Sequence, residues 1–144
     1  PDAPAIQRYT EAHRGARYVG HLASRTDLAV AYASGDVFVT PGRYETFGMS
    51  TLEALCSGLC VVGIRDSGTA SLVAAPLGVM TAPGDPAAMA AAIADAADRV
   101  DDATRDACHD FAASRYSWDR VFPKYLSIYR DLLCASAEPV EVTA

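Results

Sequence analysis

Apolar and polar positions along the chain follow two patterns, short apolar runs and longer stretches with helical periodicity. The short runs predict four strands, at residues 16–19, 37–40, 60–64 and 78–81. The run at 60–64 is continuously apolar, which is typical of a parallel strand covered on both faces. The chain is therefore expected to build a parallel sheet.

Helices are predicted between and after these strands. The helical stretches cover residues 3–13, 26–33, 49–57, 69–74, 86–100, 104–114 and 118–135. Ser24 or Thr26 could cap the second of them, and Asp85 followed by Pro86 is typical of a helix start. Ser117 is expected to start the last helix. Within that helix Pro123 removes a backbone hydrogen bond, so we expect a kink or a restart there.

The alternation of strands and helices predicts an α/β fold, a Rossmann-like parallel sheet flanked by helices. The chain has 144 residues, of which 51% are apolar, and this suits one domain with one core. The domain is expected to cover residues 1–135, followed by a disordered tail at 136–144. Because the chain begins with Pro rather than Met, we expect it to be cut or processed.

The charge and hydropathy of the chain limit the classes of partner that it is expected to bind. The net charge is -6 and the Lys and Arg residues are scattered, which argues against a nucleic-acid surface. No apolar run reaches the roughly 20 residues that span a bilayer, and no signal-peptide pattern opens the chain. We therefore expect a cytoplasmic protein without a transmembrane segment, and leave open peripheral membrane contact through other parts of a longer protein.

The four cysteines do not have the spacing of a zinc site. We expect Cys56, Cys60, Cys108 and Cys134 to be buried, reduced thiols, since a free cysteine behaves as a small apolar residue. No metal site is expected. The sequence also offers no Ser-His-Asp or Cys-His set that would indicate nucleophilic catalysis.

Candidate chemistry lies in residues 41–58, where Glu45 and Glu53 flank a turn centred on Gly48 at the start of a predicted helix. Free amides at a helix N-terminus favour a phosphate, and a glycine lets the backbone approach it closely. Carboxylates beside that turn repel phosphate, so their expected partners are hydroxyl groups. The segment is suited to a phosphorylated sugar.

Two simpler interpretations remain open from the residues alone. Ser50 and Glu53 have the spacing of a capping box, in which Glu53 only returns a hydrogen bond to the backbone. Glu45 is expected to have no local partner, and its simpler interpretation is a solvated loop carboxylate.

The spacing from Glu45 to Glu53 resembles the E-x7-E motif of retaining glycosyltransferases with the GT-B fold. The surrounding sequence looks like the C-terminal, donor-binding domain of the family that includes bacterial mannosyl- and glucosyltransferases. The similar stretches include Thr-Phe-Gly, Leu-Glu-Ala and Ser-Gly. The resemblance extends over residues 17–20, 28–36, 78–94 and 116–133, and so covers nearly the whole chain. It implies a partial C-terminal domain of a GT-B fold.

The resemblance also implies roles for individual residues. Glu45, the candidate catalytic residue, would contact hydroxyls of the donor sugar, and Glu53 would accept hydrogen bonds from the ribose. The remaining donor-binding residues would be Phe47, Gly48 and Met49 at the sugar and pyrophosphate, Ser50 and Thr51 beside the phosphates, and His21 and Leu22 near the base. The donor would be a nucleoside-diphosphate sugar, and no further cofactor is implied.

The resemblance places this chain after the first two strands of the donor-binding domain, without the acceptor domain. Such a piece is expected to be inactive alone and to self-associate through unpaired edges. Two departures, Ser67-Gly68 for the usual Gly-Gly and Ser71 for a downstream Glu, leave the donor sugar open. The alternatives are a non-catalytic nucleotide-binding or scaffold module, and a sugar-nucleotide epimerase or phosphorylase of related fold.

Overall fold

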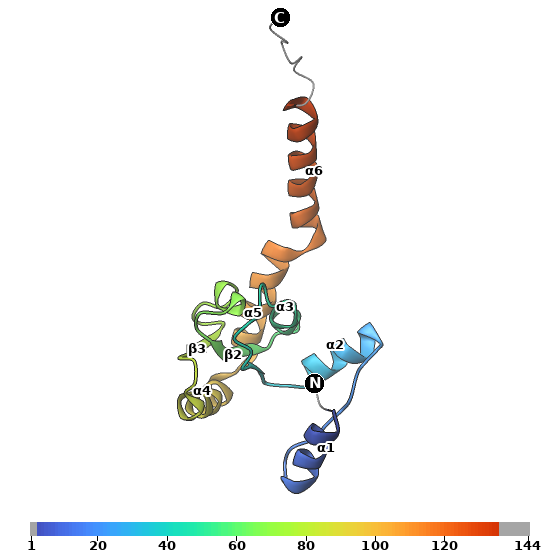
Figure 1. Cartoon of the computed structure of the whole chain (residues 1–144). Helices are drawn as coiled ribbons and strands as arrows, with labels where there is room; N and C mark the ends of the chain where they lie inside the picture. The colour runs from blue at the N-terminus through green and yellow to red at the C-terminus, as the bar shows by residue number, and fades with distance from the viewer. Residues whose placement is uncertain (1–2, 136–144) are drawn as a thin grey trace, which may run out of the picture.

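A three-stranded parallel sheet forms the centre of the molecule in a computed structural model that describes residues 3–135. The sheet order is β1-β2-β3, with β1 at Val37–Thr40, β2 at Cys60–Ile64 and β3 at Gly78–Thr81 (Figure 1). These are the bounds expected for three of the four strands. The helices are α1 (Ala3–Ala12), α2 (Arg25–Ala33), α3 (Met49–Cys56), α4 (Pro86–Arg99), α5 (Asp102–Tyr116) and α6 (Trp118–Ala135), with a 3-10 turn η1 at Gly68–Ser71.

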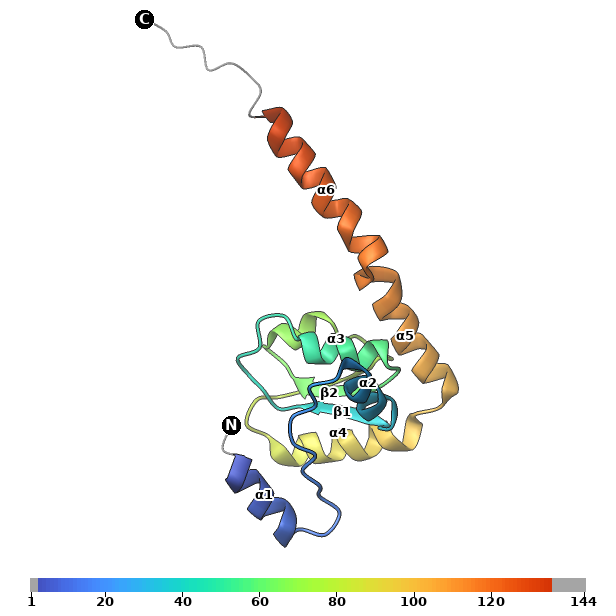
Figure 2. The same cartoon turned by 90° about the vertical axis from the view of Figure 1, so that its right-hand side faces the viewer.

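Helices cover both faces of the sheet. In Figure 2, α3 lies on one face and α4 on the other, and α5 packs beside α3. Every residue of β2 is buried, as expected for a parallel strand between two layers. Val61 belongs to the core cluster with Leu55 of α3 and Cys108 of α5, whereas Val62 belongs to the cluster with Ala96 of α4. The fold is therefore the α/β arrangement that the sequence predicts.

Caps and an ion pair fix where the helices begin and how α5 attaches. Ser24 caps α2 by accepting the amide of Asp27 at 3.3 Å, and Asp85 caps α4 by accepting the amide of Ala88 at 2.8 Å. Arg105 of α5 bonds Asp36, just before β1, at 2.5 Å. The expected caps at Ser24 and Asp85 are confirmed.

The strand expected at residues 16–19 is wrong. The structure has no strand between α1 and α2, and Tyr18 and Val19 are exposed. A strand needs a hydrogen-bonded neighbour, and within residues 3–135 the segment has none, because β1 pairs only with β2. The apolar run alone does not supply that neighbour.

The sequence predicts a kink or a restart at Pro123; the restart is wrong, and the kink stays a prediction. Helix α6 runs from Trp118 to Ala135 without interruption, with Pro123 inside it. The residue that loses its hydrogen bond to the proline, Asp119, lies in an exposed turn, where water can bond its carbonyl instead. No residue of α6 is buried, and the helix extends away from the sheet (Figures 1 and 2).

All four cysteines are free thiols, but only two of them are buried. Cys60 and Cys108 lie in the core, whereas Cys56 and Cys134 are exposed, which corrects the expectation that all four are buried. Burial raises the pKa of Cys108 to about 11, with a smaller contribution from Cys60, so this thiol stays neutral at physiological pH. Within residues 3–135 no cluster of three or more potential metal ligands occurs.

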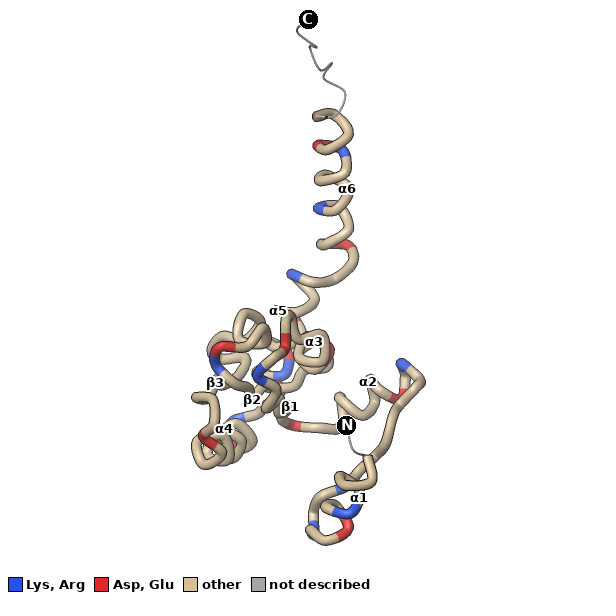
Figure 3. Tube along the Cα trace, viewed as in Figure 1, with Lys and Arg blue, Asp and Glu red and all other residues tan. Residues whose placement is uncertain are grey.

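Two further expectations concern the ends and the surface of the chain. The tail expected at residues 136–144 lies outside the described residues. Across residues 3–135, no helix combines the length and apolar character needed to cross a bilayer. Lys and Arg are dispersed over several elements, among them α1, α5 and α6 (Figure 3).

The contact between β2 and the start of β3 gives a first prediction. A Cβ on Gly78 would lie 2.0 Å from the carbonyl oxygen of Val61, so Gly78→Ala should push the paired strands apart. We expect a loss of about 2 kcal/mol or more in the free energy of unfolding, measured by urea denaturation. The control is Gly42→Ala, where only Thr40 Oγ1 lies within 4 Å, at 3.9 Å. Similar costs for both variants would contradict the prediction.

Candidate functional site

The candidate site lies where the strands end. Because β1, β2 and β3 are parallel, the loops that follow Thr40, Ile64 and Thr81 emerge at one edge of the sheet, the edge at which open α/β folds bind ligands. The loop after β1 carries Glu45 and leads into α3. The loop after β2 packs against it.

Gly48 starts α3 in a conformation that suits glycine. It is the N-cap residue with φ 92° and ψ 56°, in the left-handed region, and no side chain caps the helix. The amide of Leu52 makes the first hydrogen bond of the helix, to the carbonyl of Gly48 at 2.9 Å. The amides of the first turn therefore lack partners within the helix, and such amides favour an anion.

The capping box does not form. Ser50 lies inside α3 rather than at its cap, and within residues 3–135 the side chain of Glu53 makes no hydrogen bond to the backbone of Ser50. Glu53 instead accepts a hydrogen bond from the hydroxyl of Tyr32 on α2, with 3.2 Å between the oxygen atoms. The simpler interpretation of Glu53 as a helix cap is therefore wrong.

The loop after β2 fits closely against the loop after β1. The amide of Gly68 donates to the carbonyl of Glu45 at 2.8 Å. A Cβ on Gly68 would lie 2.2 Å from the carbonyl oxygen of Thr46, so only glycine fits there. Below Gly48, the buried hydroxyls of Thr51 and Thr69 lie 3.4 Å apart. These contacts hold the turn at Gly48 in place.

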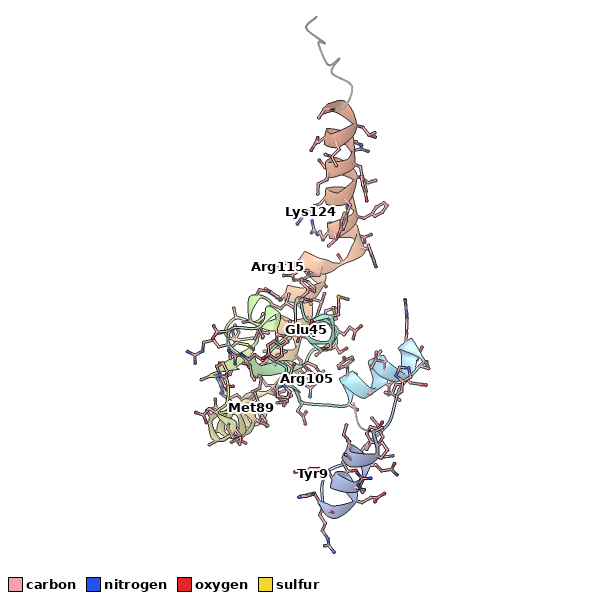
Figure 4. All side chains as sticks on the ribbon, viewed as in Figure 1. Tyr9, Glu45, Met89, Arg105, Arg115 and Lys124 are labelled. Carbon is pink, nitrogen blue, oxygen red and sulfur yellow. The ribbon has the colours of Figure 1, made fainter. Side chains whose placement is uncertain are left out.

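Glu45 has a local partner, contrary to the expectation from the sequence. Its Oε1 accepts the amide of Thr46 at 3.0 Å and that of Phe47 at 3.4 Å. The side chain is exposed and lies on the α3 side of the sheet, with Met89 of α4 on the other side (Figure 4). The carboxylate is thus turned back over the loop that precedes α3.

Glu53 affects the ionisation of two neighbours. Burial raises the pKa of Tyr32, and the charge of Glu53 and the hydrogen bond to it raise it further. Burial also raises the pKa of Cys56, one turn along α3, and the charge of Glu53 again adds to the effect. Both neighbours are therefore neutral at physiological pH, and Glu53 faces a hydroxyl donor and a neutral thiol.

The structure brings most of the expected site residues together. Phe47, Gly48, Met49, Ser50 and Thr51 are consecutive at the start of α3, with Glu45 before them and Glu53 after them. Phe47 and Met49 are 40% and 58% exposed, whereas the side chain of Thr51 is buried. The turn is thus open to solvent on one side.

His21 and Leu22 lie apart from this turn. They belong to the segment between α1 and α2, which leads from α1 to the end of α2 that lies farthest from the sheet (Figure 1). His21 is exposed and Leu22 is partly buried. Two other residues that contact the site, Tyr32 and Thr69, were not predicted from the sequence, because both contacts join residues that are distant along the chain.

A cavity at the same edge is too small for a large ligand. It measures about 270 Å³ and is lined by the end of β2, by the loops after β1 and β3, and by α4: Pro41, Ile64, Ala82, Gly84, Asp85, Pro86 and Met89. Typical ligand pockets measure about 300–1,000 Å³. The cavity does not include Gly48, whose neighbours Phe47 and Met49 are exposed, so a ligand bound at Gly48 would rest on an open surface of this chain.

Comparison with known proteins identifies the family. Residues 1–99 match the family described as glycosyl transferases group 1. The chain belongs to this family. It is 34% identical over 110 residues to the D-inositol 3-phosphate glycosyltransferase of Corynebacterium urealyticum, covering 74% of this chain and 26% of that protein. It is 32% identical over 119 residues to the glycogen synthase of Mycobacterium tuberculosis, covering 81% of this chain and 28% of that protein.

A solved relative shares the fold. The sucrose-phosphate synthase of Thermosynechococcus elongatus superposes with a TM-score of 0.77 at 26% identity. The superposition covers 92% of this chain and 33% of that one. The expected GT-B-type α/β fold is confirmed, and the chain matches between 26% and 33% of the lengths of these three proteins.

The crowding at Gly48 gives a second prediction. A Cβ there would lie 3.0 Å from Thr69 Oγ1, in addition to the strain of a positive φ. Gly48→Ala should lower the free energy of unfolding by about 2 kcal/mol. Gly84 has a φ of 76°, and nothing lies within 4 Å of the position that its Cβ would take, so Gly84→Ala should cost only about 1 kcal/mol. Equal losses in urea denaturation would show that Thr69 does not constrain the turn.

Proposed function

We propose that this chain is the later part of the donor-binding domain of a retaining glycosyltransferase that uses a nucleoside-diphosphate sugar. The observation that carries the proposal is the turn at Gly48, whose free helix amides lie between Glu45 and Glu53 along the chain. Amides suit the diphosphate, and carboxylates suit the hydroxyls at either end of the donor. The E-x7-E spacing and membership of the group 1 family support this assignment.

In this proposal, each part of the donor meets a different part of the turn. The diphosphate lies against the amides of Gly48, Met49 and Ser50. The ribose hydroxyls donate to Glu53, and the sugar hydroxyls donate to Glu45 after its carboxylate leaves the loop amides. The loop that carries His21 and Leu22 would border the base in the complete domain.

The chemical step requires stabilisation of the leaving diphosphate. As the bond from the anomeric carbon to the phosphate oxygen breaks, negative charge develops on that oxygen, and preorganised amides can stabilise it by several kcal/mol. No metal ion is needed for this role of the amides. The acceptor, and further cationic groups for the diphosphate, would come from parts of the enzyme outside this chain.

The loop after β2 carries a residue that bears on the choice of donor sugar. By resemblance to the family, Ser71 stands where a Glu is usual, and its hydroxyl donates to the carbonyl of Gly68 at 2.8 Å. A calorimetric screen of UDP, GDP and ADP sugars against the complete protein would identify the donor.

The four free thiols support a reducing compartment, which we propose is the cytoplasm.

A non-catalytic nucleotide-binding module is the second candidate. The open surface at Gly48 and the limited coverage of the relatives favour it for this chain taken alone. Such a module would bind nucleotide without turnover. Detection of sugar transfer by the complete protein would therefore exclude it.

Substitution of the two carboxylates should affect nucleotide binding and turnover separately. Glu53→Gln in the complete protein should weaken nucleotide binding about 10-fold, because a ribose contact acts equally in the ground and transition states. Glu45→Gln should mainly lower kcat, by about 10- to 100-fold, because a contact to the reacting sugar strengthens at the transition state. Calorimetry and steady-state kinetics measure the two effects.

The control for both variants is Glu11→Gln, an exposed carboxylate on α1. Neither Kd nor kcat should change in it. If Glu45→Gln and Glu53→Gln instead lose the same stability with unchanged kinetics, both carboxylates are structural and the proposal fails.

We also propose that the chain expressed alone self-associates. Among the described strands, β1 is paired on one side only, and α6 carries exposed apolar side chains such as Ile128 and Tyr129. Light scattering coupled to size exclusion should show species larger than a monomer. Val39→Lys on β1 should reduce association through the edge, and Ile128→Lys should reduce association through α6. A sharp monomer peak for the unmodified chain would refute the proposal.

A further inference from the structure

Tyr32 connects three elements at the site. It lies in the last turn of α2, and its ring meets Phe38 of β1 edge to face, with the ring centroids 5.8 Å apart and the planes at 65°. Its hydroxyl oxygen lies 3.2 Å from Oε2 of Glu53 on α3. The ring therefore packs against the sheet, while the hydroxyl reaches the carboxylate of the candidate site.

The hydroxyl acts as the donor in this hydrogen bond. Burial raises the pKa of Tyr32 above its ordinary value, and the charge of Glu53 raises it further, so the phenol keeps its proton at neutral pH. A carboxylate can only accept. The bond therefore has one direction, from Tyr32 to Glu53.

This bond restricts an otherwise exposed side chain. Glu53 is exposed on α3, and an exposed glutamate can populate several rotamers. Within residues 3–135, the hydrogen bond to its carboxylate is the one at Oε2, which leaves Oε1 available as an acceptor. A side chain that is already ordered in the free protein loses less conformational entropy when the ligand binds, and this improves affinity.

We propose that Tyr32 is a positioning residue, which orients Glu53 so that Oε1 is presented to the hydroxyls of the bound nucleotide. The inference rests on the proposed function, in which Glu53 binds the ribose. It adds that the orientation of Glu53 is set by α2, the helix that precedes β1. Tyr32 itself does not contact the reacting atoms.

The test removes only the hydroxyl. Tyr32→Phe keeps the ring against Phe38, so the fold should be retained and the midpoint of urea unfolding unchanged. The Kd of the complete protein for UDP, GDP or ADP, whichever binds the unmodified protein, should rise about 3- to 10-fold. The kcat at saturating donor should stay within about two-fold, because the effect acts on binding.

A matched control and a double variant isolate the pair. Tyr129→Phe removes a hydroxyl from exposed α6 and should leave Kd unchanged. In a Glu53→Ala background, which removes the acceptor of the Tyr32 hydroxyl, Tyr32→Phe should have little further effect, because both changes act through one interaction.

The outcomes separate this inference from the proposed function. If Glu53→Gln binds nucleotide as tightly as the unmodified protein, or no nucleotide binds, the ribose role fails and the inference fails with it. If Glu53→Gln weakens binding but Tyr32→Phe does not, the ribose role stands and the positioning role of Tyr32 is overturned. A lower stability of Tyr32→Phe with unchanged Kd would likewise assign the hydroxyl a structural role.

Discussion

The burial of β2 between two layers is the constraint on which the rest of the molecule depends. Val61 faces the cluster formed with α3 and α5, while Val62 faces α4, so one strand fixes both layers. Because β2 is also paired on both edges and runs parallel to its neighbours, its end at Ile64 sets the edge from which the site loops leave. The geometry around Gly48 is therefore a consequence of core packing.

The fold could be predicted from the sequence wherever local pattern and tertiary environment agree. The runs at Val37–Thr40 and Cys60–Ile64 are apolar, and both gain hydrogen-bonded neighbours. The run at residues 16–19 is similarly short but includes Arg17, and no described strand pairs with it. At Pro123 the helix does not restart, because an exposed carbonyl that loses its helical hydrogen bond can bond water instead.

In the candidate site, too, some features could be predicted from the sequence and others could not. The turn at Gly48 and its two flanking carboxylates are encoded within a few consecutive residues, so the sequence indicates them directly. The contact of Tyr32 with Glu53 spans 21 residues and that of Thr51 with Thr69 spans 18, so both depend on how the elements pack. The hydrogen bonds from the loop amides to Glu45 were missed for a different reason, since they depend on the rotamer of one side chain.

The junction between α5 and α6 has a mechanical consequence. A single extended residue, Ser117, with φ -62° and ψ 151°, separates the two helices. Helix α6 has 18 residues and is therefore a rod of about 27 Å. A rotation of about 10° at this joint would move the far end by about 5 Å, given that rod length. A small change in the backbone torsions of Ser117 would thus move the far end of α6 by more than the distance between two side chains in contact.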